Sequence, residues 1–301
     1  MTVTEQPKGP GGGSGPTEEG TTHSTPVVNV EGLVQIYRME GQDVAALSGV
    51  NLIVQPGEVV ALVGPSGAGK STLLSVLAGL TTPSAGRVRV AGHELSGNDV
   101  GLLDDVRGTD LAVLLQDVSK NLLPYLTVRQ NVELGWPSQL RERIDVDEAL
   151  DIVGLAPELR PQPVQSISAE ARQLTAIAAT IVTKPAVLLA DEPTSSLAGP
   201  AVRAVTDAIL RANEELGTTV IAVTHDLDVA TALKARVITI RDGRIRMDAR
   251  GGNTHVMVRD DGIPLPDDIL KQFPNGTAVT IRPGDDADTF IVRRATGGEQ
   301  A

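Results

Sequence analysis

The chain has 301 residues, 41% of them hydrophobic and 21% charged, which is typical of a globular protein with a substantial core. Its formal net charge of −12 argues against nucleic acid as the main partner, because binding to phosphate backbones needs a basic surface. The absence of cysteine excludes disulfides, thiolate metal sites and cysteine nucleophiles.

In chain order, residues 1–26 are rich in Gly, Pro, Thr and Glu. They predict a disordered tail, because such a segment cannot bury enough apolar surface to offset its chain entropy. Regular patterning begins at Val27 and predicts strands over residues 27–37 and 44–54. Helices are predicted over residues 70–80, 169–182 and 201–216. The stretch from about residue 92 to 182 is poor in strand signals and predicts a helical insertion.

Three short apolar runs predict the central sheet. Their continuous rather than alternating apolarity indicates strands buried on both faces, as in a parallel sheet covered by helices. Each run ends in polar residues, at the edge where open α/β sheets bind ligands. The runs are residues 59–63, 186–190 and 219–223. The sequence therefore predicts an α/β fold. Further along, Asp242-Gly243 predicts a two-residue hairpin turn.

The segment after the first run matches the phosphate-loop pattern G-x-x-x-x-G-K-[ST] in full. The glycines let the backbone wrap around phosphate oxygens, and the following helix start points its N–H groups at an anion. Lys70 is expected to reach the β and γ phosphates, and the Ser71 hydroxyl to bind Mg²⁺. We therefore predict a site for ATP and Mg²⁺, rather than a glycine-rich turn before an ordinary helix. The residues are Gly64, Pro65, Ser66, Gly67, Ala68, Gly69, Lys70, Ser71 and Thr72.

Two acidic residues follow the second apolar run. Asp191, at the C-terminal edge of the predicted strand, is placed to hold Mg²⁺ through water. Glu192 is placed as the general base for the attacking water. The alternative is a solvated pair in a surface loop. The apolar strand before the pair and the rigid Pro193 after it favour the functional interpretation.

With these two motifs, residues 27–247 resemble the ABC ATPase family. Segments 114–116 and 121–132 look like its glutamine loop, above all in the lipoprotein-release, macrolide-export and cell-division branch. The resemblance implies that Gln116 touches Mg²⁺ and the attacking water, and that the following loop meets a membrane permease. His225 lies in a segment similar to the switch-histidine motif and would reach the γ-phosphate. Tyr37 stands at the family's spacing for the aromatic that stacks on adenine, although it could simply pack in its strand.

The resemblance breaks down in the signature segment, with which one subunit of the family covers the γ-phosphate held by another. The serine is kept as Ser168, but Ala169 and Glu170 replace two glycines. At about 5 Å from a phosphate charge, the Glu170 carboxylate would be repelled by roughly 3 kcal/mol at an effective dielectric near 20. Ala198 also replaces an aspartate of the family. We therefore predict an intact nucleotide site, a damaged signature, and a heterodimer with a second ATPase.

Residues 253–295 predict a small β-rich C-terminal domain, followed by a tail over residues 296–301. The expected order is a strand at 255–258, Asp261 to Pro266, a helix at 267–273, and strands at 278–281 and 289–292. This order resembles the swapped-hairpin barrel of bacterial transition-state regulators; an unspecific β-rich extension is the alternative. Because about 40 residues rarely bury enough core to fold alone, we expect the segment to act by dimerisation.

These observations predict an ABC ATPase domain over residues 27–249. The family fold is a P-loop NTPase core with an antiparallel β-subdomain and a helical subdomain, here at about residues 92–182. The expected role is ATP hydrolysis coupled to an integral membrane permease, with no nucleic acid partner. No apolar run reaches the roughly 20 residues that span a bilayer and no signal peptide is evident, so we expect a cytoplasmic subunit held on the inner face of the membrane by its permease.

The alternative function is a regulatory subunit that binds ATP but contributes little hydrolysis. Retention of Glu192 and His225 favours the enzyme, because a purely structural nucleotide site does not need a base. A DNA-repair or translation-type member of the family is disfavoured, because those usually carry two cassettes in one chain or long coiled coils.

Overall fold

The computed structural model describes residues 25–39, 42–97, 109–135, 144–250, 253–256, 279–283 and 290–294. The N-terminal tail predicted over residues 1–26 therefore lies almost wholly outside the described residues. The Asp261-to-Pro266 segment and the helix predicted at 267–273 also lie outside them.

A seven-stranded sheet forms the centre of the molecule, in the order β11-β10-β9-β3-β8-β7-β6. Strands β9, β3, β8, β7 and β6 are parallel, whereas β10 runs antiparallel to both β9 and β11. The bounds are β3 (Val59–Val63), β6 (Leu111–Leu114), β7 (Val187–Asp191), β8 (Thr219–Thr224), β9 (Arg236–Arg241), β10 (Arg244–Arg250) and β11 (Asn253–Val256).

Two smaller antiparallel sheets accompany it. One has the order β2-β1-β4-β5, with β1 (Val28–Met39), β2 (Gln42–Val54), β4 (Ala85–Val90) and β5 (His93–Glu94). The other is the pair β12 (Val279–Pro283) and β13 (Phe290–Arg294).

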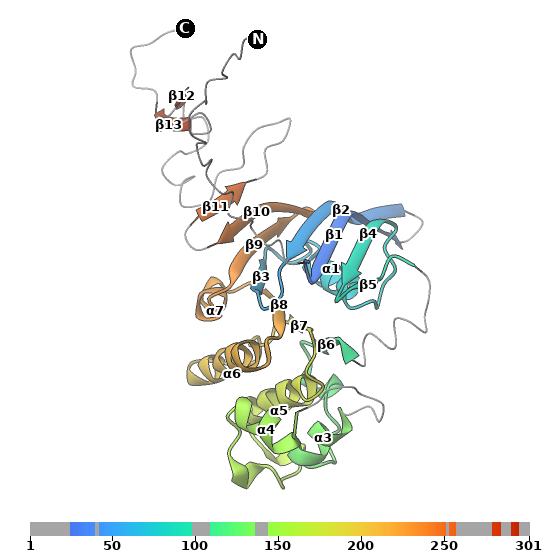
Figure 1. Ribbon diagram of the computed structural model, residues 1–301, viewed down its shortest axis with the longest axis vertical. Coiled ribbons are helices and arrows are strands. Elements are labelled where there is room, and N and C mark those ends of the chain that lie inside the picture. The colour runs from blue at the N-terminus through green and yellow to red at the C-terminus, as the bar shows by residue number, and fades with distance from the viewer. Residues whose placement is uncertain are drawn as a thin grey trace, which may run out of the picture.

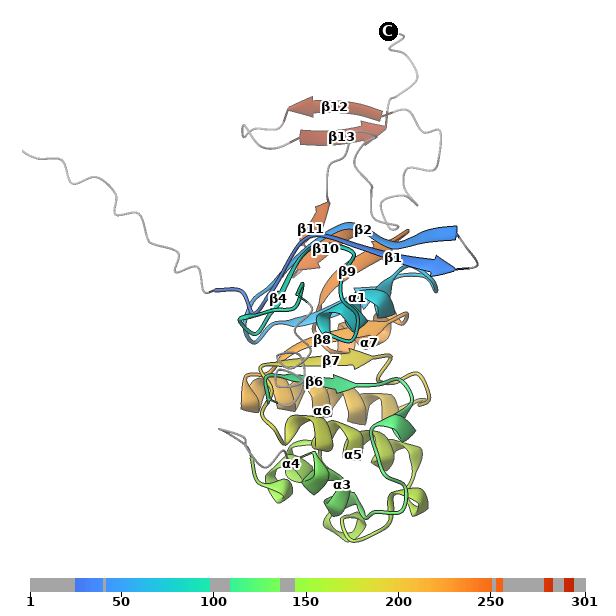
Figure 2. The ribbon, with the colours of Figure 1, turned by 90° about the vertical axis from the view of Figure 1, so that its right-hand side faces the viewer.

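The helices lie on both faces of the central sheet. Helix α1 contacts β2 and β4 as well as β7 and β8, whereas α3, α4, α5 and α6 pack together on the opposite side (Figures 1 and 2). The bounds are α1 (Lys70–Leu77), α3 (Val128–Leu134), α4 (Val146–Ile152), α5 (Ala169–Ile181), α6 (Pro200–Leu216) and α7 (Leu227–Ala232), with 3-10 turns η1 (Val118–Lys120), η2 (Pro157–Leu159) and η3 (Val164–Ser166). None of the described helices is long and apolar enough to span a membrane.

The central strands are buried on both faces, as their continuous apolarity predicted. In β7, Leu188 and Ala190 join the core formed with α3 to α6. Val187 and Leu189 point the other way, into the core formed with α1, β1, β2 and β4. The sheet therefore separates two aliphatic cores, and its strand ends stay open at the carboxyl edge.

Two predicted boundaries are wrong. Residues 111–114 lie in the stretch assigned to the helical insertion, but they form β6 at the edge of the main sheet. Likewise β11 lies beyond the predicted boundary at residue 253, yet it pairs with β10 and continues the same sheet. In addition, α1 ends at Leu77 rather than at residue 80, because Gly79 adopts a left-handed φ of 64°.

Arg236 on β9 ties the central sheet to its neighbours. Its Nη1 donates to the Ile53 carbonyl of β2 (3.0 Å) and lies 3.2 Å from a Glu58 carboxylate oxygen. Its Nε donates to Asp248 of β10 at 2.5 Å, a bond that raises the pKa of Arg236. The Arg236 side chain is only 14% exposed. One cation thus neutralises two largely buried carboxylates.

Arg236→Met is expected to lower the free energy of unfolding by about 3 kcal/mol, because it removes the largely buried guanidinium that bonds to both carboxylates. Urea unfolding of the full chain measures this. Arg241→Met, which removes an exposed arginine from the same strand, should change stability by less than about 0.5 kcal/mol. Equal losses in the two variants would contradict this role of Arg236.

Candidate nucleotide-binding site

The loop between β3 and α1 needs its glycines for steric reasons. A Cβ on Gly64 would lie 2.1 Å from the Ile240 carbonyl oxygen, which no side chain can accommodate. Gly69 has φ of 100°, and a Cβ there would lie 2.6 Å from the Ala46 carbonyl oxygen. Gly67 also has a positive φ, of 76°. The close contacts therefore require glycine at Gly64 and Gly69, the positive φ favours it at Gly67, and the loop presents its backbone rather than side chains.

Lys70 is the first residue of α1 and points back along this loop. Its Nζ donates to the Gly64 carbonyl (2.7 Å) and to the Pro65 carbonyl (2.9 Å). The residue is only 8% exposed. An ammonium group held against a loop at a helix N-terminus makes a positively charged cradle suited to phosphate.

The loop forms one wall of a pocket of about 500 Å³. Residues from five segments meet there: β2, the β3–α1 loop with the start of α1, the second residue after β6, the end of β7 and the end of β8. This is the carboxyl edge of the parallel strands, where the sequence placed a ligand site. The lining residues are Ala46, Ser66, Gly67, Gly69, Lys70, Ser71, Thr72, Gln116, Asp191, Glu192, Val223 and His225.

Asp191 ends β7 with one carboxylate oxygen in an unusual position. Its Oδ1 is buried and has no hydrogen-bond partner among the described residues. Burial raises the pKa of the Asp191 carboxyl; the charge of Glu192 adds to this, and Lys70 opposes it. An unpaired buried carboxylate oxygen is costly, and a cation or its water would satisfy it.

The side chains of the pocket suit Mg²⁺ better than they suit a metal ion whose ligands all come from the protein. No group of three or more His, Cys, Asp or Glu side chains forms a metal site among the described residues. Ser71, Gln116 and Asp191 supply oxygen ligands in the same pocket. Mg²⁺ usually combines a few such ligands with water and phosphate oxygens, so these three residues would hold it together with a bound nucleotide.

Glu192 and His225 form a hydrogen-bonded pair inside the pocket. His225 Nδ1 lies 2.9 and 3.0 Å from the two carboxylate oxygens of Glu192, so this nitrogen carries the proton. Glu192 has φ of 49°, a left-handed conformation costing roughly 1 kcal/mol, and its N–H donates to the Val223 carbonyl (3.0 Å). Its side chain is 14% exposed and that of His225 is 69% exposed. The Glu192 carboxylate is thus fixed and the histidine stays accessible.

Some residues predicted for the site do not line the pocket. Gly64 and Pro65 accept hydrogen bonds from Lys70 through their carbonyls, and Ala68 is buried in the hydrophobic core. Tyr37 lies on β1 opposite Val44. Ser168 caps α5, where its Oγ accepts from the Ala171 N–H at 3.1 Å. The structure therefore supplies no contact to this pocket from Tyr37 or Ser168.

Two residues of the site were missed by sequence reasoning. Ala46 of β2 lines the pocket, and its carbonyl presses on Gly69. Gly243 was predicted only as a turn residue, yet its N–H donates to the Ala68 carbonyl (3.0 Å) and a Cβ there would lie 2.6 Å from the Ala46 carbonyl oxygen. No local pattern marks an alanine in a strand, so only the long-range contact identifies it.

Comparison with known proteins agrees with the family resemblance of the sequence motifs. Residues 47–195 match the family model described as ABC transporter. An uncharacterized ABC transporter ATP-binding protein of Thermotoga maritima is 38% identical over 223 residues, which cover 72% of this chain and 93% of that protein. The methionine import ATP-binding protein MetN of Nocardia farcinica is 34% identical over 225 residues, covering 73% of this chain and 66% of that protein. The chain thus spans about two thirds of the methionine-import relative it matches.

Solved structures of similar proteins share the fold. A dimeric structure of the ATP-binding cassette MJ0796, in a post-hydrolysis state bound to ADP and phosphate, has a TM-score of 0.66 and 30% identity, and the match covers 74% of this chain and 98% of that one. The cbiO1 protein of Clostridium perfringens, part of the ABC transporter complex cbiONQ, also has a TM-score of 0.66, with 28% identity and coverage of 75% and 89%.

Asp191→Asn is expected to stabilise the nucleotide-free chain by up to about 1 kcal/mol at neutral pH, because a raised pKa means that the folded state disfavours the charged carboxyl. The gain should shrink at acidic pH, where the carboxyl is protonated in both states. Urea unfolding at several pH values measures it. The same change should weaken Mg²⁺-dependent nucleotide binding. Asp207→Asn on the exposed side of α6 is the control, and a destabilised Asp191→Asn would contradict the argument.

Proposed function

The chain belongs to the family of ABC transporter ATP-binding proteins, and from this membership we propose that it binds ATP and hydrolyses it to drive a membrane transport complex. The observation that carries the proposal is the convergence of Lys70, Asp191, Glu192 and His225 in one pocket. A phosphate cradle, an oxygen ligand set and a fixed carboxylate base are the parts that phosphoryl transfer to water requires.

Each part has a distinct role in the proposed reaction. The loop N–H groups and Lys70 bind the β and γ phosphates. Ser71, Gln116 and Asp191 would hold Mg²⁺, which would neutralise phosphate charge. Glu192 accepts a proton from the water that attacks the γ-phosphorus, and the bond from that phosphorus to the β–γ bridging oxygen breaks, giving ADP and phosphate. His225 donates to Glu192 and so orients the carboxylate, and its exposed ring would contact the γ-phosphate.

Glu192→Gln is expected to retain ATP binding and to lower turnover by about 10²–10⁴, because the amide cannot accept the proton from water. The measurement is phosphate release by the assembled complex, with binding followed separately by calorimetry. Lys70→Ala gives the contrast, because it should abolish binding itself. Turnover that is equal in Glu192→Gln and the parent would refute hydrolysis at this site and favour a regulatory subunit that only binds ATP.

We also propose that the complex pairs this chain with a second, different ATPase. The support comes from the start of α5, where the Ser168 hydroxyl is already used as a cap, Ala169 carries a Cβ and Glu170 adds a carboxylate in the first turn. Such an end covers a partner's phosphate poorly. A partner with an intact signature would complete the pocket of this chain, and the dimeric structure of the similar MJ0796 cassette supports the pairing of two cassettes.

The remaining partner in the proposal is an integral membrane permease. Relatives such as MetN and the phosphonates import ATP-binding protein PhnC of Bdellovibrio bacteriovorus, 37% identical over 235 residues, are named for import. They support a transport role with a membrane partner at the inner face. They do not test the branch expected from the glutamine loop, which stays a prediction. The dimerisation role of residues 253–295 also stays a prediction.

The isolated chain is expected to hydrolyse ATP slowly, and Ala169→Gly combined with Glu170→Gly should raise its rate by at least about tenfold by removing the Cβ and the repelling charge. Phosphate release measured against protein concentration tests this, because the gain requires a dimer. The same double change in a Glu192→Gln background is the control and should show no gain. If the unmodified chain alone is as active as its partnered form, the asymmetry argument fails.

A further inference from the structure

Two segments of the helical region run side by side and are joined by backbone hydrogen bonds. The first, residues 126–129, follows the loop that begins at Gln116; the second, residues 160–164, precedes α5. An isolated antiparallel bridge pairs Thr127 with Pro163. The bonds are Val128 N–H to the Gln162 carbonyl (2.9 Å), Arg129 N–H to the Arg160 carbonyl (3.0 Å) and Val164 N–H to the Leu126 carbonyl (3.0 Å).

Each segment leads directly to a part of the molecule that the proposed function uses. Residues 126–129 follow Tyr125, which is 70% exposed, in the loop expected to meet the permease. The buried Asn131 holds this loop, because its Oδ1 accepts from the Leu123 N–H (2.7 Å) and its Nδ2 donates to the Thr127 carbonyl (2.9 Å). On the other side, residues 160–164 pass through η3 into Ser168, the cap of α5.

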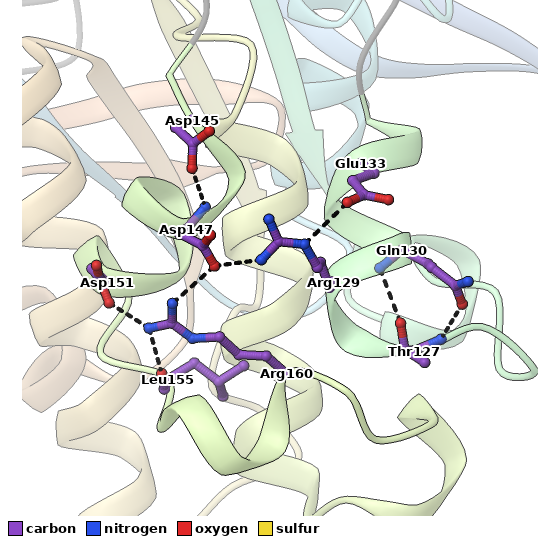
Figure 3. A network of polar contacts seen from close by, with 9 residues as sticks. All are labelled: Thr127, Arg129, Gln130, Glu133, Asp145, Asp147, Asp151, Leu155 and Arg160. Atoms are coloured by element: carbon purple, nitrogen blue, oxygen red, sulfur yellow. Dashed lines mark hydrogen bonds and ion pairs between the residues drawn. The ribbon is translucent and has the colours of Figure 1, made fainter.

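A single carboxylate joins the two segments a second time (Figure 3). Asp147, in the first turn of α4, accepts from Arg129 Nη1 at 2.5 Å and from Arg160 Nη1 at 3.1 Å, both on the same oxygen. The two arginines are the pair already bonded through their backbones. Hydrogen bonds from Arg129, and then from Arg160, hold the pKa of Asp147 below its usual range.

Each of the two arginines has partners of its own besides the shared Asp147. Arg129 also contacts Glu133 on its own helix, and Arg160 also contacts Asp151 and the Leu155 carbonyl. Among these groups only Asp147 bonds to both arginines. These ion pairs are only partly buried, with side-chain exposures of 43% for Arg129, 14% for Arg160 and 46% for Asp147, so their contribution to stability is modest. Their main effect is geometric, because Asp147 fixes two guanidinium groups, and hence two backbone segments, relative to α4.

We propose that Asp147 is a positioning residue, which binds Arg129 and Arg160 together and locks residues 126–129 to residues 160–164 so that both segments move as one body. A displacement of the loop after Gln116 is then passed to the Ser168 end of α5. That this displacement carries a signal from a permease to the nucleotide rests on the proposed function. The lock between the two segments through Asp147 does not depend on it.

Amide hydrogen exchange in the full-length chain tests the lock. In Asp147→Asn, exchange at Val128, Arg129 and Val164 should rise together by about tenfold or more, because these are the N–H groups that bond between the segments. Asp147→Glu, which retains the carboxylate, should restore most of the protection. Glu133→Gln is the matched control, because it removes the other carboxylate partner of Arg129 without touching Arg160, and it should leave exchange at Val164 unchanged.

Two results would overturn the proposal. One is unchanged exchange at the three amides in Asp147→Asn. The other is faster exchange confined to α4, which would show that Asp147 only stabilises the start of that helix. Retained binding of ATP–Mg²⁺ by Asp147→Asn shows that the variant is folded, because Asp147 does not line the nucleotide pocket. The measurement needs neither turnover nor a partner, so its failure is distinguishable from failure of the proposed ATPase.

Discussion

The close approach of backbone to backbone around the β3–α1 loop is the constraint on which the rest of the site depends. Gly64 lies against the Ile240 carbonyl, and Gly69 and Gly243 both lie against the Ala46 carbonyl. Three elements distant in sequence, β2, the β3–α1 loop and the β9–β10 turn, therefore meet with no room for a side chain. This contact seats the antiparallel β1–β2 pair on the central sheet and gives the loop the shape that presents Lys70 and its N–H groups to a phosphate.

Unfavourable features collect at the same edge of the sheet. Glu192 has a left-handed backbone, and Asp191 keeps a buried oxygen without a hydrogen-bond partner among the described residues. The two cores beneath them are filled by aliphatic side chains from both faces of β7 and β8. A well-packed sheet can hold both of these unfavourable acidic residues at the ends of its strands. The strands that carry them are fixed by the burial of apolar side chains rather than by contacts within the site.

The sequence predicted most of the pocket because its parts are short local patterns that follow buried strands. Asp191 ends β7, His225 directly follows β8, and Lys70 begins α1 after the loop that follows β3, so a parallel sheet brings all three to one edge. Strand β6 was missed because a four-residue apolar run has no period that separates a strand from a helix. Ala46 and Gly243 were missed because their role is a contact between distant segments. Tyr37 and Ser168 lie outside the pocket, and for them the sequence carries only the family resemblance.

The position of α5 shows why substitutions in its first turn would affect the nucleotide site of a partner subunit and not the nucleotide pocket of this chain. Its Ser168 end is held by η3 and residues 160–164, and through them by Asp147 and the segment after Gln116. The pocket of this chain is instead built from the β3–α1 loop and the ends of β6, β7 and β8. In the proposed dimer, Ala169 and Glu170 in place of glycine would alter the surface offered to another subunit, and neither residue lines the nucleotide pocket. Under the proposed function, a chain organised in this way would keep the groups of its own nucleotide pocket while its contribution to a second nucleotide would be weakened, which is the physical basis for proposing an unequal pair.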